Sequence, residues 1–329
     1  MQLQPRYSGN KYYNVLPTSV SPPSGYAALL RRYLFEKAER EPRQPLGPFV
    51  ADAVALATPV PADALRVTWL GHSTTLIEVD GRRFLTDPVW GQRVSPSQLA
   101  GPKRFFAPPL PLAQLPPLDG IILSHDHYDH LDEAAIRALA KRGERFYCPL
   151  GVGAHLRRWG VPIERITEAT WWDEVEITPD FKLIATPARH FSGRGLLNRD
   201  STLWASWVLK GPQHRVFFGG DSGPFDEAFR QIGAAYGPFD LVMLEIGAAD
   251  PEWADIHLGP DNALAAHHLL GGGPLLPLHW GTFNLAFHAW RQPVQRLIEA
   301  APADATLLLP APGQRVDVAA GAHNARWWE

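Results

Sequence analysis

A dense cluster of imidazoles and carboxylates between Ser124 and Asp132 constrains this chain more than any other feature. The stretch reads Ser-His-Asp-His-Tyr-Asp-His-Leu-Asp, and the spacing His125-X-His127-X-Asp129-His130 places three histidines and one aspartate close together. Neutral imidazoles and a carboxylate are typical ligands of zinc or another borderline divalent cation. The alternative, a polar surface loop, suits a single histidine better than four potential ligands at this spacing.

The residues on either side of the cluster predict a strand before it and a helix after it. Asp119 to Leu123 is a short apolar run, and Asp132 is a typical N-cap for a helix that ends at Gly143. The cluster therefore lies on a strand-to-helix loop, where side chains can converge on one point.

Composition indicates a globular protein and excludes several classes. The chain has 329 residues, of which 45% are hydrophobic and 20% charged, and its net charge of -3 provides no basic field for binding nucleic acid. The single cysteine, Cys148, excludes an intrachain disulfide and argues against a thiolate zinc site. We see no secretory signal and no apolar run long enough to span a membrane, and we expect a cytoplasmic protein.

The composition of the sequence changes near residue 60. Residues 1–60 are rich in proline and aromatic residues, and we expect them to form an N-terminal extension packed on a catalytic domain of residues 61–329. Within the extension, Tyr26 to Arg40 is a predicted amphipathic helix with Leu29, Leu30, Tyr33 and Leu34 on one face. Packing of this helix on its own domain is the favoured interpretation, and peripheral contact with a membrane is the alternative.

Beyond residue 64 the sequence predicts strands, beginning with a meander that turns at Asp80-Gly81. Three further potential ligands each lie just past the end of a predicted strand: His190, Asp221 and His279. Strand ends on one edge of a sheet lie near one another, so these three side chains can join the first cluster. Taken singly, each has an ordinary structural interpretation. The Gly220-Asp221-Ser222-Gly223 match to a trypsin-like nucleophile loop is rejected because such enzymes need disulfides.

In this order, the seven side chains resemble the ligand pattern of the metallo-β-lactamase superfamily. Neighbouring motifs are similar to those of the N-acyl-phosphatidylethanolamine phospholipase D group, which also resembles the ascorbate-6-phosphate lactonases. The similarity extends roughly from residue 65 to residue 313. The motifs are Thr68-Trp69-Leu70-Gly71-His72-Ser73-Thr74, Thr86-Asp87-Pro88, Gly101-Pro102-Lys103-Arg104, Pro187-Ala188-Arg189-His190-Phe191-Ser192-Gly193-Arg194 and His279-Trp280-Gly281-Thr282-Phe283.

The resemblance implies a four-layer αββα sandwich of the α/β (α+β) class and a site for two Zn²⁺, with Mn²⁺ or Fe²⁺ as alternatives. It assigns His125, His127 and His190 to one metal. It assigns Asp129, His130 and His279 to the other, with Asp221 bridging both. Two such cations against two carboxylates leave a positive site that attracts anionic substrates. They also lower the pKa of bound water toward about 7, so that a bridging hydroxide is available as a nucleophile.

Three more residues are candidates for supporting roles. His72 and Asp87 lie at predicted strand ends and suit hydrogen bonds to ligating imidazoles, although Asp87 equally suits a cap for the turn at Pro88. His257 matches a histidine near the active site of the phospholipase relatives. We assign catalytic roles to Asp129 and His257, and we expect His257 to bind the phosphate or protonate the leaving group.

The leading hypothesis is a dinuclear zinc phosphodiesterase of the N-acyl-phosphatidylethanolamine phospholipase D type, acting on a small-molecule or phospholipid substrate. A lactonase or other ester hydrolase with the same metals is the alternative. A non-enzymatic metal-bound scaffold or sensor is disfavoured by the complete ligand set. Processing of RNA by a tRNase Z-like enzyme is disfavoured by the acidic balance, and we expect no nucleic-acid partner.

Overall fold

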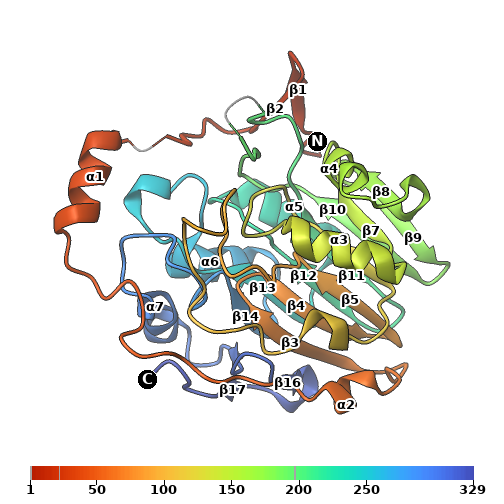
Figure 1. Cartoon of the computed structure of the whole chain (residues 1–329). Helices are drawn as coiled ribbons and strands as arrows, with labels where there is room; N and C mark the ends of the chain where they lie inside the picture. Colours follow the sequence, from red (N-terminus) through yellow and green to blue (C-terminus); the bar gives the residue numbers. More distant parts are fainter. Residues whose placement is uncertain (1, 22, 196–197) are drawn as a thin grey trace.

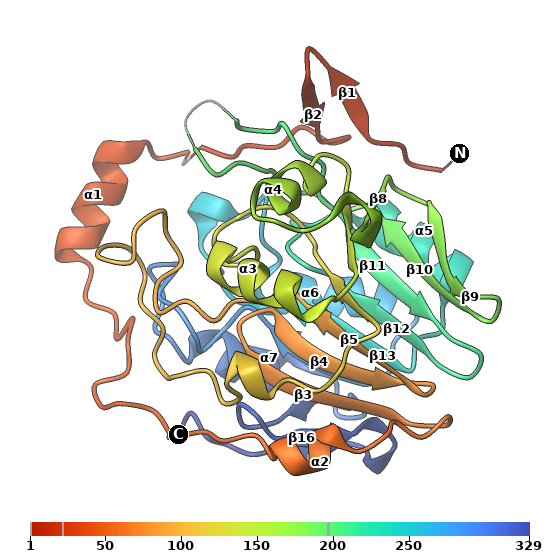
Figure 2. The ribbon, with the colours of Figure 1, turned by 45° about the vertical axis from the view of Figure 1, so that its right-hand side comes forward.

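Extended segments of the chain pair into two β-sheets that face each other, and helices cover the outer face of each sheet (Figures 1 and 2). This computed structural model describes residues 2–21, 23–195 and 198–329. The four layers confirm the αββα sandwich that the sequence resemblance implied.

Among the described residues, the larger sheet contains seven strands. The strands β3, β4 and β5 form the expected antiparallel meander with Asp80 and Gly81 in its turn, and β5 to β8 run parallel. In spatial order the strands are β16 (Arg315–Asp317), β3 (Leu65–Gly71), β4 (Thr74–Val79), β5 (Arg82–Thr86), β6 (Gly120–Ile122), β7 (Phe146–Pro149) and β8 (Ile166–Ala169).

The smaller sheet contains six strands within the same described ranges. Its strands β9 to β12 are antiparallel, and β12, β13 and β14 are parallel. In spatial order they are β14 (Leu275–Leu278), β13 (Leu241–Glu245), β12 (Arg215–Phe218), β11 (Ser206–Lys210), β10 (Phe181–Thr186) and β9 (Glu174–Thr178). Short pairs outside the two sheets are β1 (Arg6–Ser8) with β2 (Lys11–Tyr13), and β15 (Leu308–Leu309) with β17 (His323–Asn324).

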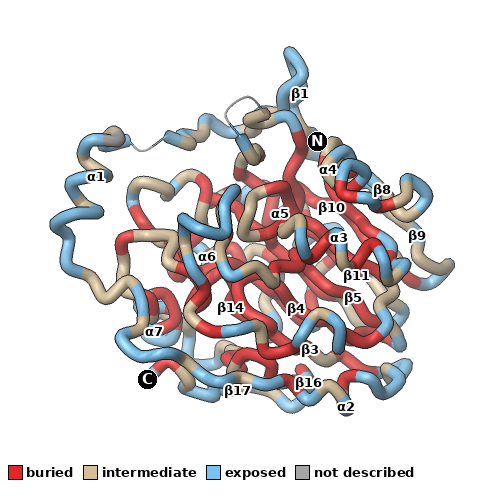
Figure 3. Tube along the Cα trace, in the orientation of Figure 1, coloured by how far each residue is buried: buried red, intermediate tan, exposed pale blue. Residues whose placement is uncertain are grey.

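Two apolar cores separate the layers. Ile136 and Leu139 of α3 pack with Leu76 and Leu85 on the outer face of the larger sheet. The second core fills the space between the sheets and continues to α5, α6 and α7 beyond the smaller sheet. Buried segments follow the strands in Figure 3. The helices are α1 (Tyr26–Phe35), α2 (Ala53–Ala57), α3 (Glu133–Arg142), α4 (Gly153–Arg158), α5 (Asp226–Tyr236), α6 (Gly259–Leu269) and α7 (Gln292–Ala300).

The strand directions bring several loops to one edge of the sandwich. The pairings make β3, β5 and β6 parallel to one another in the larger sheet. They likewise give β10, β12, β13 and β14 one direction in the smaller sheet. The loops that follow these strands therefore leave each sheet at a single edge, which is where the sequence places its polar side chains.

The N-terminal region differs from the expectation. The helix α1 ends at Phe35, before Arg40, and stands beside the sandwich (Figures 1 and 3). Its residues Leu30, Tyr33 and Leu34 are exposed, so the prediction that this apolar face packs on the domain is wrong. An ion pair of 2.7 Å between Arg32 and Asp250 turns the polar side of α1 toward the domain. None of the helices in the described ranges is long and apolar enough to cross a bilayer.

Candidate metal centre

The seven predicted donors of the candidate centre lie at this edge of the sandwich on four loops, which follow β6, β10, β12 and β14. The loop after β6 carries four of the donors, and its conformation follows from the strand before it and from α3 after it. The N-cap side chain of Asp132 accepts a hydrogen bond from the Ala134 N–H, and Gly143 ends the helix in the left-handed conformation. Both helix boundaries were predicted.

The structure brings the seven predicted side chains together in two groups. In the first group, His127 Nδ1 lies 2.8 Å from His125 Nε2 and 3.2 Å from His190 Nε2. These three donors come from the loops after β6 and β10, on different sheets. The first group therefore joins the two halves of the sandwich.

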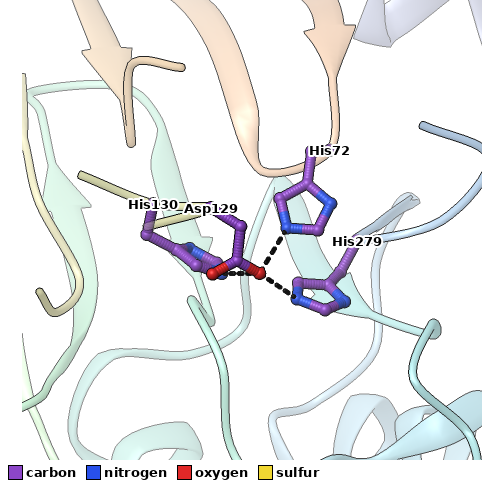
Figure 4. Close-up of side chains that lie close together, drawn as sticks. All are labelled: His72, Asp129, His130 and His279. Atoms are coloured by element: carbon purple, nitrogen blue, oxygen red, sulfur yellow. Dashed lines mark hydrogen bonds and ion pairs between the residues drawn. The ribbon is translucent and has the colours of Figure 1, made fainter. Parts of the chain in front are cut away.

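The second group surrounds the carboxylate of Asp129 (Figure 4). Asp129 Oδ2 lies 3.1 Å from His72 Nε2, 3.4 Å from His279 Nε2 and 3.6 Å from His130 Nε2. His72 was expected only in a supporting role, and the structure places its ring directly against this group, 4.0 Å from the ring centre of His279.

Asp221 lies between the two groups. Its Oδ2 atom is 3.2 Å from both His130 Nε2 and His279 Nε2. The same atom is 3.7 Å from His190 Nε2 and 4.0 Å from His125 Nε2. One carboxylate is therefore within reach of donors from both groups, as a bridging ligand must be.

The donor set fits divalent cations. Among the described residues, several buried atoms that can bind a metal ion have no hydrogen-bond partner: His130 Nε2, Asp221 Oδ1 and both ring nitrogens of His279. Ligands held tetrahedrally at about 2.0–2.1 Å from zinc lie about 3.3 Å from one another. Most of the separations around Asp129 and Asp221, from 3.1 to 3.7 Å, are close to that value.

Burial and charge act in opposite directions on the ionisation of these groups. Burial lowers the pKa values of His125 and His190 well below their ordinary value, which favours neutral rings. At His279, the effect of burial is outweighed by Asp221 and Asp129, which raise the pKa to about 10. Despite their own burial, the pKa values of Asp129 and Asp221 are held well below the ordinary range by His130 and its neighbours. The site therefore stabilises positive charge, whether protons or metal ions carry it.

Asp87 holds His130 in position. Its Oδ2 atom accepts from His130 Nδ1 at 2.7 Å and from Ser124 Oγ at 2.5 Å, and Oδ1 accepts from the Ser124 N–H at 2.8 Å. Because this contact occupies Nδ1, the other ring nitrogen, Nε2, which lies 3.2 Å from Asp221 Oδ2, is the atom that can bind a metal ion. This contact favours the supporting role considered for Asp87 over a simple turn cap.

A second residue holds the histidine-rich loop from its outer side. Arg194 Nη1 donates to the carbonyl oxygens of Asp126 and Leu131 at 2.8 and 2.7 Å, and its guanidinium lies 4.0 Å from the ring centre of Tyr128. These two hydrogen bonds span the turn that carries His127, Asp129 and His130. Nothing in the local sequence around Arg194 predicts this contact, because its partners lie more than sixty residues earlier.

His257 lies beside the centre and depends on a residue that the sequence reasoning missed. Its Nδ1 atom is 2.6 Å from Glu245 Oε2 and 3.9 Å from Asp221 Oδ2. Glu245 is buried, and its other oxygen accepts from the Ser222 and Leu258 N–H groups. The available signal was a carboxylate at the end of the otherwise apolar strand Leu241–Glu245.

Three residues of the site have left-handed backbone conformations although none is glycine. The φ angles are 53° at His72, 31° at Asp87 and 63° at His279. Such conformations cost free energy and concentrate at functional sites. Each one occurs where the chain turns sharply after a strand, and the turn directs the side chain into the centre.

Comparison with known proteins agrees with this architecture. The family model of the beta-lactamase superfamily domain matches residues 82–280. A protein of Mycobacterium tuberculosis is 47% identical over 272 residues, which cover 81% of this chain and 72% of that one. The N-acyl-phosphatidylethanolamine-hydrolyzing phospholipase D 1 of Caenorhabditis elegans is 38% identical over 231 residues, which cover 67% of this chain and 65% of that one.

Solved structures share the fold at low sequence identity. An isothiocyanate hydrolase from Delia radicum gut bacteria has a TM-score of 0.62 and 20% identity, covering 76% of this chain and 98% of its own. Igni18, a metallo hydrolase from Ignicoccus hospitalis, has a TM-score of 0.57 and 23% identity, and the match covers 77% of this chain and 97% of Igni18. From the family match and the relatives together, the chain belongs to the beta-lactamase superfamily.

Proposed function

We propose that this metallohydrolase of the beta-lactamase superfamily is a dinuclear zinc phosphodiesterase that acts on N-acylated phosphatidylethanolamine or a similar phospholipid. The observation that carries the proposal is the position of Asp221, whose one oxygen lies within 4.0 Å of donors in both groups. The likeness to the Caenorhabditis elegans phospholipase supports the choice of a phosphodiester.

In this proposal the protein holds the reacting groups and moves protons. His125, His127 and His190 hold one cation, Asp129, His130 and His279 hold the other, and Asp221 contacts both. When bound, the cations supply a water nucleophile at neutral pH and polarise the phosphoryl oxygens. Asp129 accepts from His72 and so fixes the orientation of its own carboxylate.

His257 is the proposed acid for the leaving group or a ligand of its phosphate. Its side chain is 13% exposed, whereas that of its partner Glu245 is 1% exposed. The Glu245 carboxylate binds Nδ1 at 2.6 Å, which leaves Nε2 to face a substrate. A His257→Ala protein is expected to keep its metal content and lose activity. Full activity in that variant would remove His257 from the mechanism.

The test is to measure metal content and turnover on the same purified sample. We expect about two zinc ions per chain and hydrolysis of N-acyl-phosphatidylethanolamine and of a generic phosphodiester. Asp221→Asn is expected to abolish both metal binding and turnover, whereas the matched change Asp226→Asn, on the exposed first turn of α5, is expected to have no effect. Turnover of lactones without any phosphodiester hydrolysis would establish the lactonase alternative instead. Retention of Mn²⁺ or Fe²⁺ in place of zinc would revise the metal.

We also propose a peripheral contact of α1 with a lipid surface, in a protein that resides in the reducing cytoplasm. The exposed residues Leu30, Tyr33, Leu34 and Phe35 form an apolar patch on this helix, and Cys148 is a free thiol. Leu34→Glu is expected to reduce sedimentation with phospholipid vesicles, whereas Val54→Glu, at an even more exposed position on α2, is expected to have no effect. Unchanged sedimentation of Leu34→Glu would exclude this contact.

A further inference from the structure

A cavity of about 650 Å³ lies between the N-terminal segment, residues 6–20, and the loop that follows β10. This volume falls in the range of pockets that hold small molecules. Aromatic and aliphatic side chains dominate its wall, which includes Tyr7, Tyr12, Leu16, Val20, Phe191 and Trp204. The charged residues of the wall within the described ranges are Arg6 and Asp200, one of each sign. The cavity therefore suits an uncharged, apolar group.

Hydrogen bonds fix the N-terminal segment to the candidate metal centre. The side-chain amide of Asn14 donates to the carbonyl oxygen of His190 at 2.6 Å and accepts from its N–H at 3.1 Å. Arg189 donates to the carbonyl oxygen of Pro17 at 2.6 Å, and the Tyr12 N–H donates to the carbonyl oxygen of Asp200 at 2.8 Å. The cavity wall is thus tied to the loop that carries a candidate metal ligand.

Phe191 connects the cavity with the centre. Its ring is a wall residue of the cavity, and its ring centre lies 4.4 Å from that of His127 and 5.0 Å from that of His190. His127 and Phe191 are both partly exposed, whereas His125 and His190 are buried. The first donor group therefore adjoins the cavity through Phe191.

From this arrangement we infer that the cavity binds the hydrocarbon chain of a phosphodiester substrate whose scissile group lies at the donor cluster. The inference rests on the proposed function and adds a specificity site to it. The segment that precedes the sandwich becomes part of the active site, because it supplies Tyr12, Leu16 and Val20 to the wall. Affinity is then expected to increase with chain length until the cavity is filled.

The test compares two Val→Trp variants on a series of alkyl phosphodiesters of increasing chain length. Val20→Trp fills part of the cavity, and Val54→Trp places the same side chain on exposed α2. Each methylene that enters the cavity is expected to raise kcat/KM of the wild type by up to about fourfold. Val20→Trp is expected to stop this gain at a shorter chain and to lose at least about tenfold on the longest substrate. A small phosphodiester without an alkyl chain is expected to be hydrolysed equally by the wild type and by Val54→Trp.

Binding of alkylphosphonates, measured by calorimetry, separates this inference from the proposed function. If no phosphodiester is hydrolysed but affinity still rises with chain length and falls in Val20→Trp, the cavity assignment stands and the proposed reaction fails. Should Val20→Trp not fold, Leu16→Trp fills the cavity from a half-exposed position. An unchanged chain-length dependence in a folded cavity variant, or the same loss in Val54→Trp, would overturn the inference.

Discussion

Replacing Asp87 by asparagine tests whether the centre depends on the carboxylate that positions His130. Asp87 faces three donors: His130 Nδ1, Ser124 Oγ and the Ser124 N–H. An asparagine of the same shape has one oxygen and one NH₂ group, so at least one of these donors must face another donor. The loss of a carboxylate that orients a metal-bound imidazole typically lowers metal affinity by about 10- to 100-fold. That loss corresponds to about 1.4–2.7 kcal/mol, at 1.36 kcal/mol for each factor of ten.

The chain offers a closely matched control at the other end of the same strand. Asp80 is also buried, accepts from His214 Nδ1 at 2.5 Å and accepts from the Gln213 and His214 N–H groups. Asp80 and Asp87 flank β5, which places them about 20 Å apart along the strand. Both asparagine variants are expected to lower the free energy of unfolding by about 1–3 kcal/mol. Only Asp87→Asn is expected to lower metal affinity, measured by competition with a chromophoric chelator. Equal metal affinities in the two variants would refute the assigned role of Asp87.

Three further predictions address the centre. Removal of metal by a chelator is expected to lower the melting temperature, and calorimetry should show that added Zn²⁺ restores it; a melting temperature that is independent of metal would contradict the assigned ligands. Asn14→Ala is expected to weaken zinc binding about tenfold, because it removes two hydrogen bonds that hold the backbone of His190. Asn324→Ala on β17 is the control and should bind zinc normally in the same titration. Zinc affinity of the metal-free protein is expected to rise from pH 6 to pH 8, because His130 and His279 must release protons to bind metal. Asp221 and Asp129 raise the pKa values of both histidines against the effect of burial, that of His279 to about 10. A pH-independent affinity, measured at constant ionic strength, would contradict this reasoning.

The histidine-rich loop could be predicted because its signals are local. The apolar strand before it, the N-cap at Asp132 and the glycine at position 143 lie within a few residues of the donors that they position. His190, Asp221 and His279 could be found for the same reason, since each follows a recognisable strand. Because parallel strands end at the same edge of a sheet, these side chains can be predicted to lie together, and no individual contact has to be known.

The residues that the sequence did not reveal make contacts over long separations. Asn14 binds the backbone of a residue 176 positions later, and the segment that carries it showed no pattern that indicated a wall of the site. The placement of α1 depends on Arg32 and Asp250, which lie 218 positions apart. The helix α5 is a different case, because Ala228, Phe229, Ile232 and Tyr236 form a buried face with helical spacing that was present in the sequence and was overlooked.

Glu245 is the overlooked residue with the clearest chemical consequence. Its Oε2 atom binds His257 Nδ1, while Oε1 accepts hydrogen bonds from two backbone N–H groups. A glutamine has only one side-chain oxygen, so it can accept from His257 or from the two N–H groups, but not from both. Glu245→Gln is therefore expected to lower kcat about 10- to 100-fold with little change in zinc content, because it disturbs the proposed acid rather than the ligands. Glu78→Gln, which alters an equally buried carboxylate paired with Arg83, controls for the loss of a buried charge and should leave kcat unchanged. If Glu245 acts through His257, the double variant with His257→Ala will be no slower than His257→Ala alone. Additive losses in that double variant would show that Glu245 serves the centre by another route.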